Sequence, residues 1–245
     1  MKNKIIEAKS DKKGPYIAEV FGVPVFGGRN SEVLKKITKA MNKKAYDKPF
    51  FVVTVNPEIL MMTESDSAYK NVISGADLLV ADGKGLRLMG LQNIYPGRNM
   101  VKDLLVINEY RVFYLGGKHG VVRLMAEKYG GEWDEGEKSI RLGERENIRI
   151  LNKINKYRPD LLLVAYGAPW QERWIAQNID KLKVKVVIGV GGTFDYLTGK
   201  TRLPPKWMEK LGLEWVWRLY QEPSRWRRQL NLIRFVWKVL VFKLK

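Results

Sequence analysis

Short apolar runs alternate with longer amphipathic segments over most of this 245-residue chain. Most of the intervening segments have ten or more residues with helical periodicity, which is typical of helices that connect neighbouring strands. Uninterrupted apolar runs indicate strands that are covered on both faces, as in a parallel sheet. The pattern therefore predicts a doubly wound α/β fold whose main strands are Phe50–Val55, Asp77–Ala81, Arg111–Leu115, Leu161–Tyr166 and Val184–Val190.

Weaker patterns predict the elements around these strands. Tyr16–Phe26 alternates around Gly22, which predicts a short hairpin. Ser31–Lys44 has helical spacing, and its first residue is a suitable N-cap. A further helix is expected between residue 83 and Leu91, and a weak strand at Ser139–Leu142.

The pattern changes near residue 200, where we place the boundary between an α/β domain (1–200) and a helical appendage (201–245). Residues 200–245 contain twelve Lys and Arg against three Asp and Glu, and five of the eight tryptophans. Pro223 is expected to break or kink the helix. An apolar stripe at three- and four-residue steps follows, with cations beside it: Trp226, Leu230, Ile233, Trp237, Leu240 and Leu244. This stripe suits a membrane interface, although a helix that packs on the core, or a dimer contact, would look the same.

Composition limits the classes of partner. The net charge of +18 favours anionic partners, among them nucleic acid, anionic lipid head groups and diphosphates. No cysteine is present, so disulfides and thiolate-metal sites are excluded, and a reducing compartment fits. The first residues lack the apolar run of a signal peptide, and no stretch reaches the ~18 apolar residues of a membrane-spanning helix.

Small, polar or acidic residues follow each of the five strands. In an open α/β sheet, ligands bind outside the carboxyl ends of the strands, so these residues are expected to meet at one site. They occur in five motifs: Thr54-Val55-Asn56-Pro57-Glu58, Ala81-Asp82-Gly83, Gly116-Gly117-Lys118, Gly167-Ala168-Pro169-Trp170-Gln171 and Gly191-Gly192-Thr193-Phe194-Asp195.

Asp82 is the candidate general base, because a carboxylate at a strand's carboxyl end can accept the proton of a sugar hydroxyl. The alternative is that it caps the following helix. The turn of Gly116, Gly117 and Lys118 could bring backbone N–H groups to a phosphate or sugar, or could be a tight turn without a ligand. It is neither a Walker A loop nor a dinucleotide-binding fingerprint.

Four other polar residues have similar dual interpretations. Asn56 and Gln171 could bind sugar hydroxyls or the edge of a uracil base, or could cap helices that begin at Pro57 and Trp170. Thr54 is a candidate site residue or an ordinary β-branched strand residue. Arg98 lies in an expected loop, where it could meet a phosphate or remain solvated.

No two aspartates stand at positions i and i+2, so the arrangement that holds a metal against a nucleotide diphosphate is missing. Arginines, lysines and helix N-termini are then the groups left to stabilise a diphosphate leaving group. The appendage supplies Arg218, Arg225 and Arg228, which would share one helical face if the helix continued through Pro223.

The five strand-end motifs, in this order, resemble those of the WecG/TagA/CpsF glycosyltransferase family. So do Gly212-Leu213-Glu214-Trp215 and Gln221-Glu222-Pro223 of the appendage, and the resemblance covers roughly residues 16–235. It implies an inverting, metal-independent transferase without a cofactor on a Rossmann-like fold. The implied donor is a UDP-sugar, of N-acetylmannosamine or a related hexose, and the implied acceptor is a polyprenyl-diphosphate-linked GlcNAc.

The resemblance also implies roles for single residues. It makes Asp82, Thr54, Gln171 and Arg98 catalytic, the last because it stands five residues before Asp103. It implies substrate contacts for Asn56, the glycine turns and the appendage arginines, the last of these at the lipid diphosphate: Gly116, Gly117, Lys118, Gly167, Gly191, Gly192, Thr193, Asp195, Arg218, Arg225 and Arg228. The segment between Asp103 and Arg111 is shorter than usual, which leaves the acceptor geometry open.

These observations predict a peripheral enzyme on the cytoplasmic face of the cell membrane, bound to anionic lipid, with no nucleic-acid partner. Two other classes of protein share parts of this pattern. A basic nucleic-acid-binding protein would need its cations on a surface separate from the strand ends. A dinucleotide-dependent oxidoreductase would need the glycine fingerprint that is missing. Association into a homo-oligomer is left open.

Overall fold

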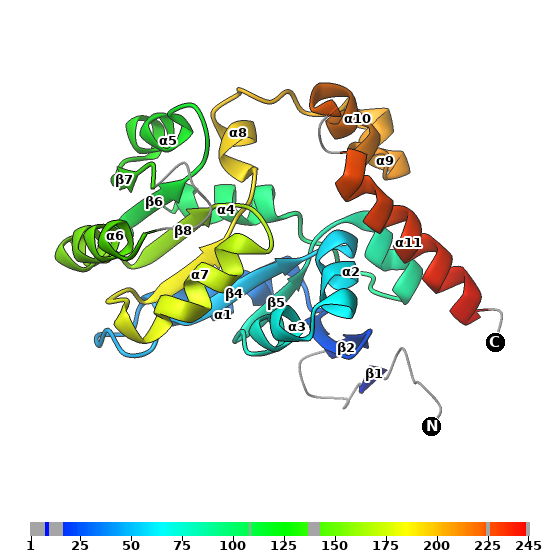
Figure 1. The fold of residues 1–245 in the computed structure, drawn as a ribbon, viewed down its shortest axis with the longest axis horizontal. Coiled ribbons are helices and arrows are strands. Elements are labelled where there is room, and N and C mark those ends of the chain that lie inside the picture. Colours follow the sequence, from blue (N-terminus) through cyan, green and yellow to red (C-terminus); the bar gives the residue numbers. More distant parts are fainter. Residues whose placement is uncertain (1–7, 10–16, 108, 137–142, 224–225, 244–245) are drawn as a thin grey trace.

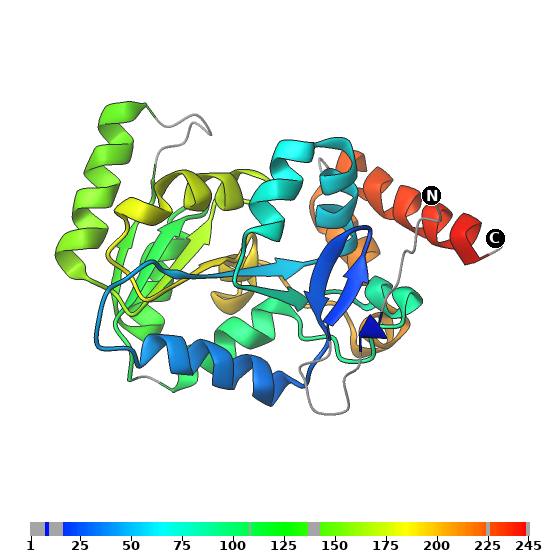
Figure 2. The ribbon, with the colours of Figure 1, turned by 90° about the horizontal axis from the view of Figure 1, so that it is seen from below.

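The computed structural model describes residues 8–9, 17–107, 109–136, 143–223 and 226–243. They form a twisted sheet with helices on both faces, and a group of helices from the C-terminal part of the chain (Figures 1 and 2). The strands are β1 (Ala8–Lys9), β2 (Ile17–Val20), β3 (Val23–Phe26), β4 (Phe50–Val55), β5 (Leu78–Ala81), β6 (Val112–Gly116), β7 (Glu132–Asp134), β8 (Leu161–Ala165) and β9 (Val186–Gly189).

Within the α/β domain, most of the connecting segments are helical. The helices are α1 (Asn30–Met41), α2 (Pro57–Ser65), α3 (Ser67–Ser74), α4 (Gly97–Val106), α5 (Val121–Tyr129), α6 (Glu144–Tyr157), α7 (Trp170–Asn178) and α8 (Thr193–Leu197), with short 3₁₀ turns η1 (Lys84–Met89) and η2 (Ile179–Lys181). The C-terminal helices are α9 (Lys206–Leu211), α10 (Glu214–Gln221) and α11 (Trp226–Lys243).

The sheet has the strand order β1-β2-β3-β5-β4-β9-β8-β6-β7. Pairing is parallel from β3 across to β7, while β2 pairs in antiparallel orientation with both β1 and β3. The five main strands are therefore parallel neighbours, and their carboxyl ends meet at one edge. This confirms the predicted α/β class and the shared edge on which the site prediction depends.

Two apolar layers cover the sheet, one on each face. On one face α2, α3, α6 and α7 pack against the strands, and on the other lie α1, α4, α5 and α8 (Figure 2). The central strands β4, β5, β6, β8 and β9 are buried along almost their whole length. This two-sided burial is the reason that their sequences are continuous apolar runs.

Some predicted boundaries were wrong. The first long helix begins at Asn30, because Glu32 Oε2 accepts the N–H of Arg29 at 2.6 Å, so Ser31 lies inside the helix and is no N-cap. The helix expected before Leu91 is the six-residue 3₁₀ turn η1, between Gly83 and Gly90, which both have positive φ. The predicted strand Ser139–Leu142 lies outside the described residues.

The hairpin prediction was correct. Strands β2 and β3 turn at Phe21 and Gly22, whose φ angles of 53° and 73° are both positive, as a tight two-residue hairpin turn requires. The Phe21 side chain of this turn meets Phe235 of α11 edge-on, with ring centroids 5.9 Å apart. The hairpin thus gives the last helix part of its support.

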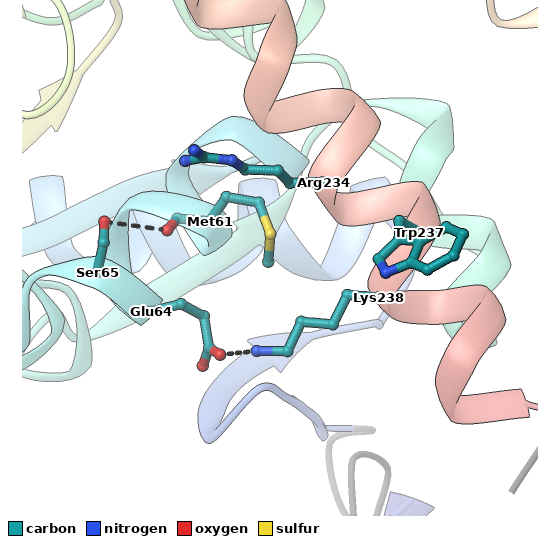
Figure 3. A pocket seen from close by; sticks show the side chains of 6 residues that line it. All are labelled: Met61, Glu64, Ser65, Arg234, Trp237 and Lys238. Atoms are coloured by element: carbon teal, nitrogen blue, oxygen red, sulfur yellow. Dashed lines mark hydrogen bonds and ion pairs between the residues drawn. The ribbon is translucent and has the colours of Figure 1, made fainter.

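Helix α11 lies along α2, and two of its residues enter the core. Phe235 and Val239, one turn apart, are buried. On the outer side of this contact is a shallow hollow of about 390 Å³, where Lys238 pairs with Glu64 and Trp237 lies beside it (Figure 3). None of the helices in the described ranges is long and apolar enough to cross a membrane.

Candidate active site

Asp82 follows β5 at the carboxyl edge. Its backbone N–H donates to Val55 O at 2.7 Å, and its carboxylate accepts the backbone N–H of Gly97, the first residue of α4. Burial raises the pKa of Asp82 from 3.8 to about 6, against the opposing effect of that hydrogen bond. Since η1 has Gly83 at its N-cap and no side-chain cap, the helix-cap interpretation of Asp82 is not what the structure shows.

Gly97 lets α4 approach the ends of β4 and β5. A Cβ at this position would lie 3.1 Å from Thr54 Cγ2 and 3.3 Å from Asp82 Oδ2, tighter than most Cβ contacts. Thr54, in β4 opposite Val80 of β5, is nearly buried. The structure thus brings Thr54, Asp82 and the start of α4 together. Sequence reasoning missed Gly97, although its place between Pro96 and Arg98 marks a helix start.

Arg98 is the second residue of α4 and does not lie in a loop as predicted. Its guanidinium donates to Glu214 Oε2 at 2.7 Å and to Glu209 Oε1 at 2.5 Å, and it lies over the ring of Tyr196. Both glutamates belong to the C-terminal helices, so Arg98 joins these helices to the carboxyl edge of the sheet. Lys84 of η1 adds a contact, because its Nζ donates to the backbone carbonyl of Glu209.

Arg218 of α10 reaches the same edge. Its guanidinium lies against Gly192, leaving no room for a Cβ there, and over the ring of Tyr196, 5.5 Å from its centroid. The charges of Arg98 and Arg218 favour the ionised form of Asp82, while that of Glu214 opposes it. Among the predicted appendage arginines, Arg218 is therefore the one that the structure brings to the site.

The side chains of the other two appendage arginines lie outside the described part of the structure. Arg225 lies outside the described residues, and Arg228 lies in α11 with a side chain that is also outside them. The predicted break at Pro223 is confirmed, since α10 ends at Gln221 and α11 begins at Trp226. Arg218 is thus on a different helix from Arg228, and these two arginines do not share one continuous helical face.

Glycines with positive φ form the turns after β6, β8 and β9. The φ angles are 86° at Gly116 and Gly117, 77° at Gly167 and 52° at Gly191, values that L side chains rarely adopt. Lys118 is exposed at the tip of the first turn. These glycines therefore set the path of the backbone at the edge, as a site that presents N–H groups would require.

Gln171, in the first turn of α7, connects two of these turns. Its Oε1 accepts the N–H of Gly167 at 3.1 Å and that of Gly191 at 2.9 Å. Its Nε2 donates to Glu172 Oε1 at 2.6 Å. Asn56 behaves differently: its Oδ1 accepts the N–H of Ile59 at 2.9 Å, so it caps α2, which is the alternative that the sequence left open.

Thr193 and Asp195 lie in the short helix α8, directly after Gly192. Thr193 is buried, and its backbone N–H donates to Val190 O at 3.1 Å. Asp195 Oδ2 would be 3.5 Å from a Cβ on Gly192, and its carbonyl accepts the N–H of Thr201. Asp195 therefore lies beside Arg218 at the end of β9 and also holds the start of the connection to α9.

Two groups of candidate residues result, one at the ends of β4 and β5 and the other at the ends of β6, β8 and β9. Arg218 lies between them and is close to both. Beside Arg98, a hollow of about 220 Å³ is lined by Lys102, Lys128, Tyr196 and neighbouring side chains. Glu209, Glu214 and Tyr196 were missed, because the sequence shows no periodicity that links them to Arg98.

In the parts of the chain that the structure describes, no three His, Cys, Asp or Glu side chains group into a metal site. The carboxyl edge offers the partly buried carboxylate of Asp82, the guanidiniums of Arg98 and Arg218, and the glycine turns after β6, β8 and β9. A carboxylate with a pKa near neutrality can accept a proton, and arginines can bind a diphosphate in two-pronged fashion. This combination suits group transfer from a diphosphate donor.

Comparison with known proteins agrees with this chemistry. N-acetylglucosaminyldiphosphoundecaprenol N-acetyl-beta-D-mannosaminyltransferase of Bacillus subtilis (strain 168) is 30% identical over 204 residues, which are 77% of this chain and 78% of the relative. The same enzyme of Bacillus spizizenii (strain ATCC 23059 / NRRL B-14472 / W23) is 31% identical and covers 79% of this chain and 80% of its own. That of Staphylococcus aureus (strain MW2) is 29% identical, with 80% and 81% covered.

The family comparison includes the appendage as well as the α/β domain. The model of the Glycosyl transferase WecG/TagA/CpsF family matches residues 18–245. The matched residues include the whole carboxyl edge around Asp82 and the helices that bring Glu209, Glu214 and Arg218 to it. On these grounds the chain is a glycosyltransferase, and it belongs to the WecG/TagA/CpsF family.

Proposed function

We propose that the protein transfers N-acetylmannosamine from a UDP donor to GlcNAc that is linked through a diphosphate to a polyprenyl lipid. The names of the three relatives support the sugar and the acceptor. The observation that carries the chemistry is Asp82, a carboxylate whose pKa burial raises to about 6, at a sheet edge that also holds Arg98 and Arg218.

The reaction in this proposal is a single displacement. The acceptor hydroxyl oxygen attacks the anomeric carbon of the donor, and the bond from that carbon to the diphosphate oxygen breaks. The electron pair of this bond leaves with UDP, and the hydroxyl proton passes to the Asp82 carboxylate. One displacement inverts the anomeric centre. Val55 O of β4 holds Asp82 by accepting its backbone N–H, and the N–H of Gly97 at the start of α4 holds its carboxylate.

In this proposal, protein groups stabilise the negative charge that develops on the leaving UDP. Arg98 and Arg218 both lie close enough to Asp82 to influence its pKa, so a diphosphate beside the reacting carbon would be near both guanidiniums. The glycine turns at Gly116, Gly167 and Gly191 lie at the same edge, where the lack of side chains lets a ligand approach the backbone. Preorganised guanidiniums supply several kcal/mol to a transition state, which supports transfer without a metal.

Helix α11 supports attachment to the membrane. The described residues of its predicted apolar stripe are exposed, with 62% of Ile233 and 70% of Trp237 accessible to solvent and Leu230 and Leu240 at least two-fifths exposed. The core contacts of α11 come instead from Phe235 and Val239. Exposed Trp and aliphatic side chains beside cations fit an anionic membrane surface, where a lipid-linked acceptor is found.

The test is an assay of purified protein with UDP-N-acetylmannosamine and a short-chain prenyl-diphosphate GlcNAc, with products identified by mass spectrometry and their anomeric configuration by NMR. We expect an inverted disaccharide product, with the same rate in EDTA, and turnover lost in Asp82→Asn. Asp180→Asn, an exposed aspartate in η2, is the matched control and should keep the wild-type rate. Transfer by Asp82→Asn at a near-normal rate would refute the assignment of the base.

A further inference from the structure

A chain of buried polar contacts lies behind the turns at the carboxyl edge. The hydroxyl of Tyr69, in α3, donates to Glu172 Oε2 at 3.1 Å, and the other oxygen of Glu172 accepts from Gln171 Nε2 at 2.6 Å. Tyr69 and Glu172 are both completely buried. Burial raises the pKa of Glu172, and the Gln171 and Tyr69 hydrogen bonds oppose that rise. A buried acidic residue at this place needs an explanation, because it costs stability.

The contacts of Glu172 determine which way the Gln171 amide points. Both oxygens of Glu172 accept hydrogen bonds, Oε2 from Tyr69 and Oε1 from Gln171, so the amide turns its NH₂ group towards Glu172. Its carbonyl oxygen then faces the opposite side, where the N–H groups of Gly167 and Gly191 both donate to it. In the reversed orientation two donors would face the NH₂ group and two acceptors would face each other. Glu172 therefore excludes the reversed amide.

The Gln171 amide is also buried and packs closely against β9. A Cβ at Gly189 would lie 2.8 Å from Gln171 Nε2, so the side chain lies directly on the backbone of β9. It joins the turn after β8 to the turn after β9, and the latter continues into Gly192, where Arg218 lies. Tyr69 is thus connected to the site through the Glu172 carboxylate and the Gln171 amide.

We propose that Glu172, held by Tyr69, is a positioning residue of the transferase: it orients Gln171 so that Gly167 and Gly191 are tied together and the donor diphosphate meets preformed turns. This inference rests on the proposed function for its ligand, the UDP moiety, and on the structure alone for the tie between the turns. Glu172 itself touches no substrate, and its effect passes entirely through Gln171.

The first experiment measures, without a substrate, how firmly the turns after β8 and β9 are held together. Glu172→Gln keeps the volume of the side chain but can offer NH₂ to the Gln171 amide. We expect faster hydrogen–deuterium exchange in peptides that contain residues 166–168 and 189–192, and unchanged exchange in β6. Glu127→Gln, at an exposed glutamate of α5 that pairs with Arg123, is the matched control and should change neither. Unchanged exchange of both turns in Glu172→Gln would overturn the inference.

The second arm measures binding of UDP by titration calorimetry. We expect Glu172→Gln to weaken UDP about tenfold, the loss of one well-placed hydrogen bond. In a Gln171→Ala background the same substitution should have no further effect, because there is no longer a Gln171 amide for residue 172 to orient. An equal loss in both backgrounds would refute action through Gln171.

Two further results separate failures of different kinds. If Glu172→Gln does not fold, Tyr69→Phe takes its place, since it removes a single hydroxyl donor to Glu172 and should change exchange and UDP affinity in the same direction by less. Unchanged exchange and affinity in that variant would overturn the inference. If the wild-type protein does not bind UDP, the proposed donor is wrong, and the exchange arm still decides whether Glu172 ties the turns.

Discussion

Replacing Asp82 by Asn should make the protein more stable while it stops turnover. The carboxylate is buried enough to raise its pKa from 3.8 to about 6, so the folded state is strained by its charge at neutral pH. Asn has the same shape and can still accept the N–H of Gly97. The substitution therefore removes the cost of the buried charge and keeps the hydrogen bond.

The magnitude follows from the two pKa values. The difference between about 6 and 3.8 is roughly two pH units, and at ~1.4 kcal/mol per unit it corresponds to about 3 kcal/mol above pH 6. Solvent still reaches part of the Asp82 side chain, which reduces this figure, and we expect about 1–2 kcal/mol. Since the folded pKa is the higher one, the cost is absent below pH 3.8, grows as pH rises towards 6, and is constant above.

Urea unfolding of both proteins at several pH values between 4 and 8 measures this difference. Asp82→Asn should match the wild type near pH 4 and exceed it by the full amount at pH 7 and 8. Asp180→Asn should stay within about 0.5 kcal/mol of the wild type throughout. A variant that gains no stability at pH 8, or gains the same amount at every pH, would show that burial does not strain this carboxylate.

Three other perturbations test the rest of the edge. The turnover of the wild type should rise about tenfold per pH unit below 6 and level off above, as the base loses its proton; a flat profile from pH 5 to 7.5 would contradict this. Glu209→Gln with Glu214→Gln should weaken docking of the C-terminal helices by about 1–2 kcal/mol, seen as faster cleavage near residue 200 in limited proteolysis; an unchanged cleavage rate would argue against it. Gly192→Ala should push Arg218 aside and lower turnover about ten- to a hundredfold at unchanged melting temperature, whereas Gly143→Ala, where a Cβ meets nothing within 4 Å, should be neutral. Full activity of Gly192→Ala would show that the position of the Arg218 guanidinium does not matter for transfer.

The main strands were predictable because a strand that is buried on both faces needs an uninterrupted run of apolar residues. Phe50–Val55 was predicted to the residue, and β5, β6, β8 and β9 to within two residues at either end. Strand β7 was missed, because its three residues Glu132–Asp134 lie at the edge of the sheet and carry two charges. A short edge strand needs no apolar run, so its sequence resembles a loop.

The site was predictable where its residues follow strands, and less so where they come from elsewhere. Asp82, Thr54 and the glycine turns lie at the shared edge because parallel strands end there. Arg98 meets Glu209 and Glu214 across more than 100 residues of sequence, and that contact depends on how the C-terminal helices dock. The two interpretations of Asn56 differ only in which group its Oδ1 accepts, a matter of one rotamer that the sequence leaves open.

The pairing of Arg98 with two glutamates has a consequence for the order of binding and release. Glu209 and Glu214 each accept one hydrogen bond from the Arg98 guanidinium, which has five N–H donors in all. In the proposed function, a diphosphate that binds Arg98 through two donors competes with these carboxylates for the same group. The two glutamates would then act as an intramolecular competitor for anions, and we expect their removal to slow the release of UDP.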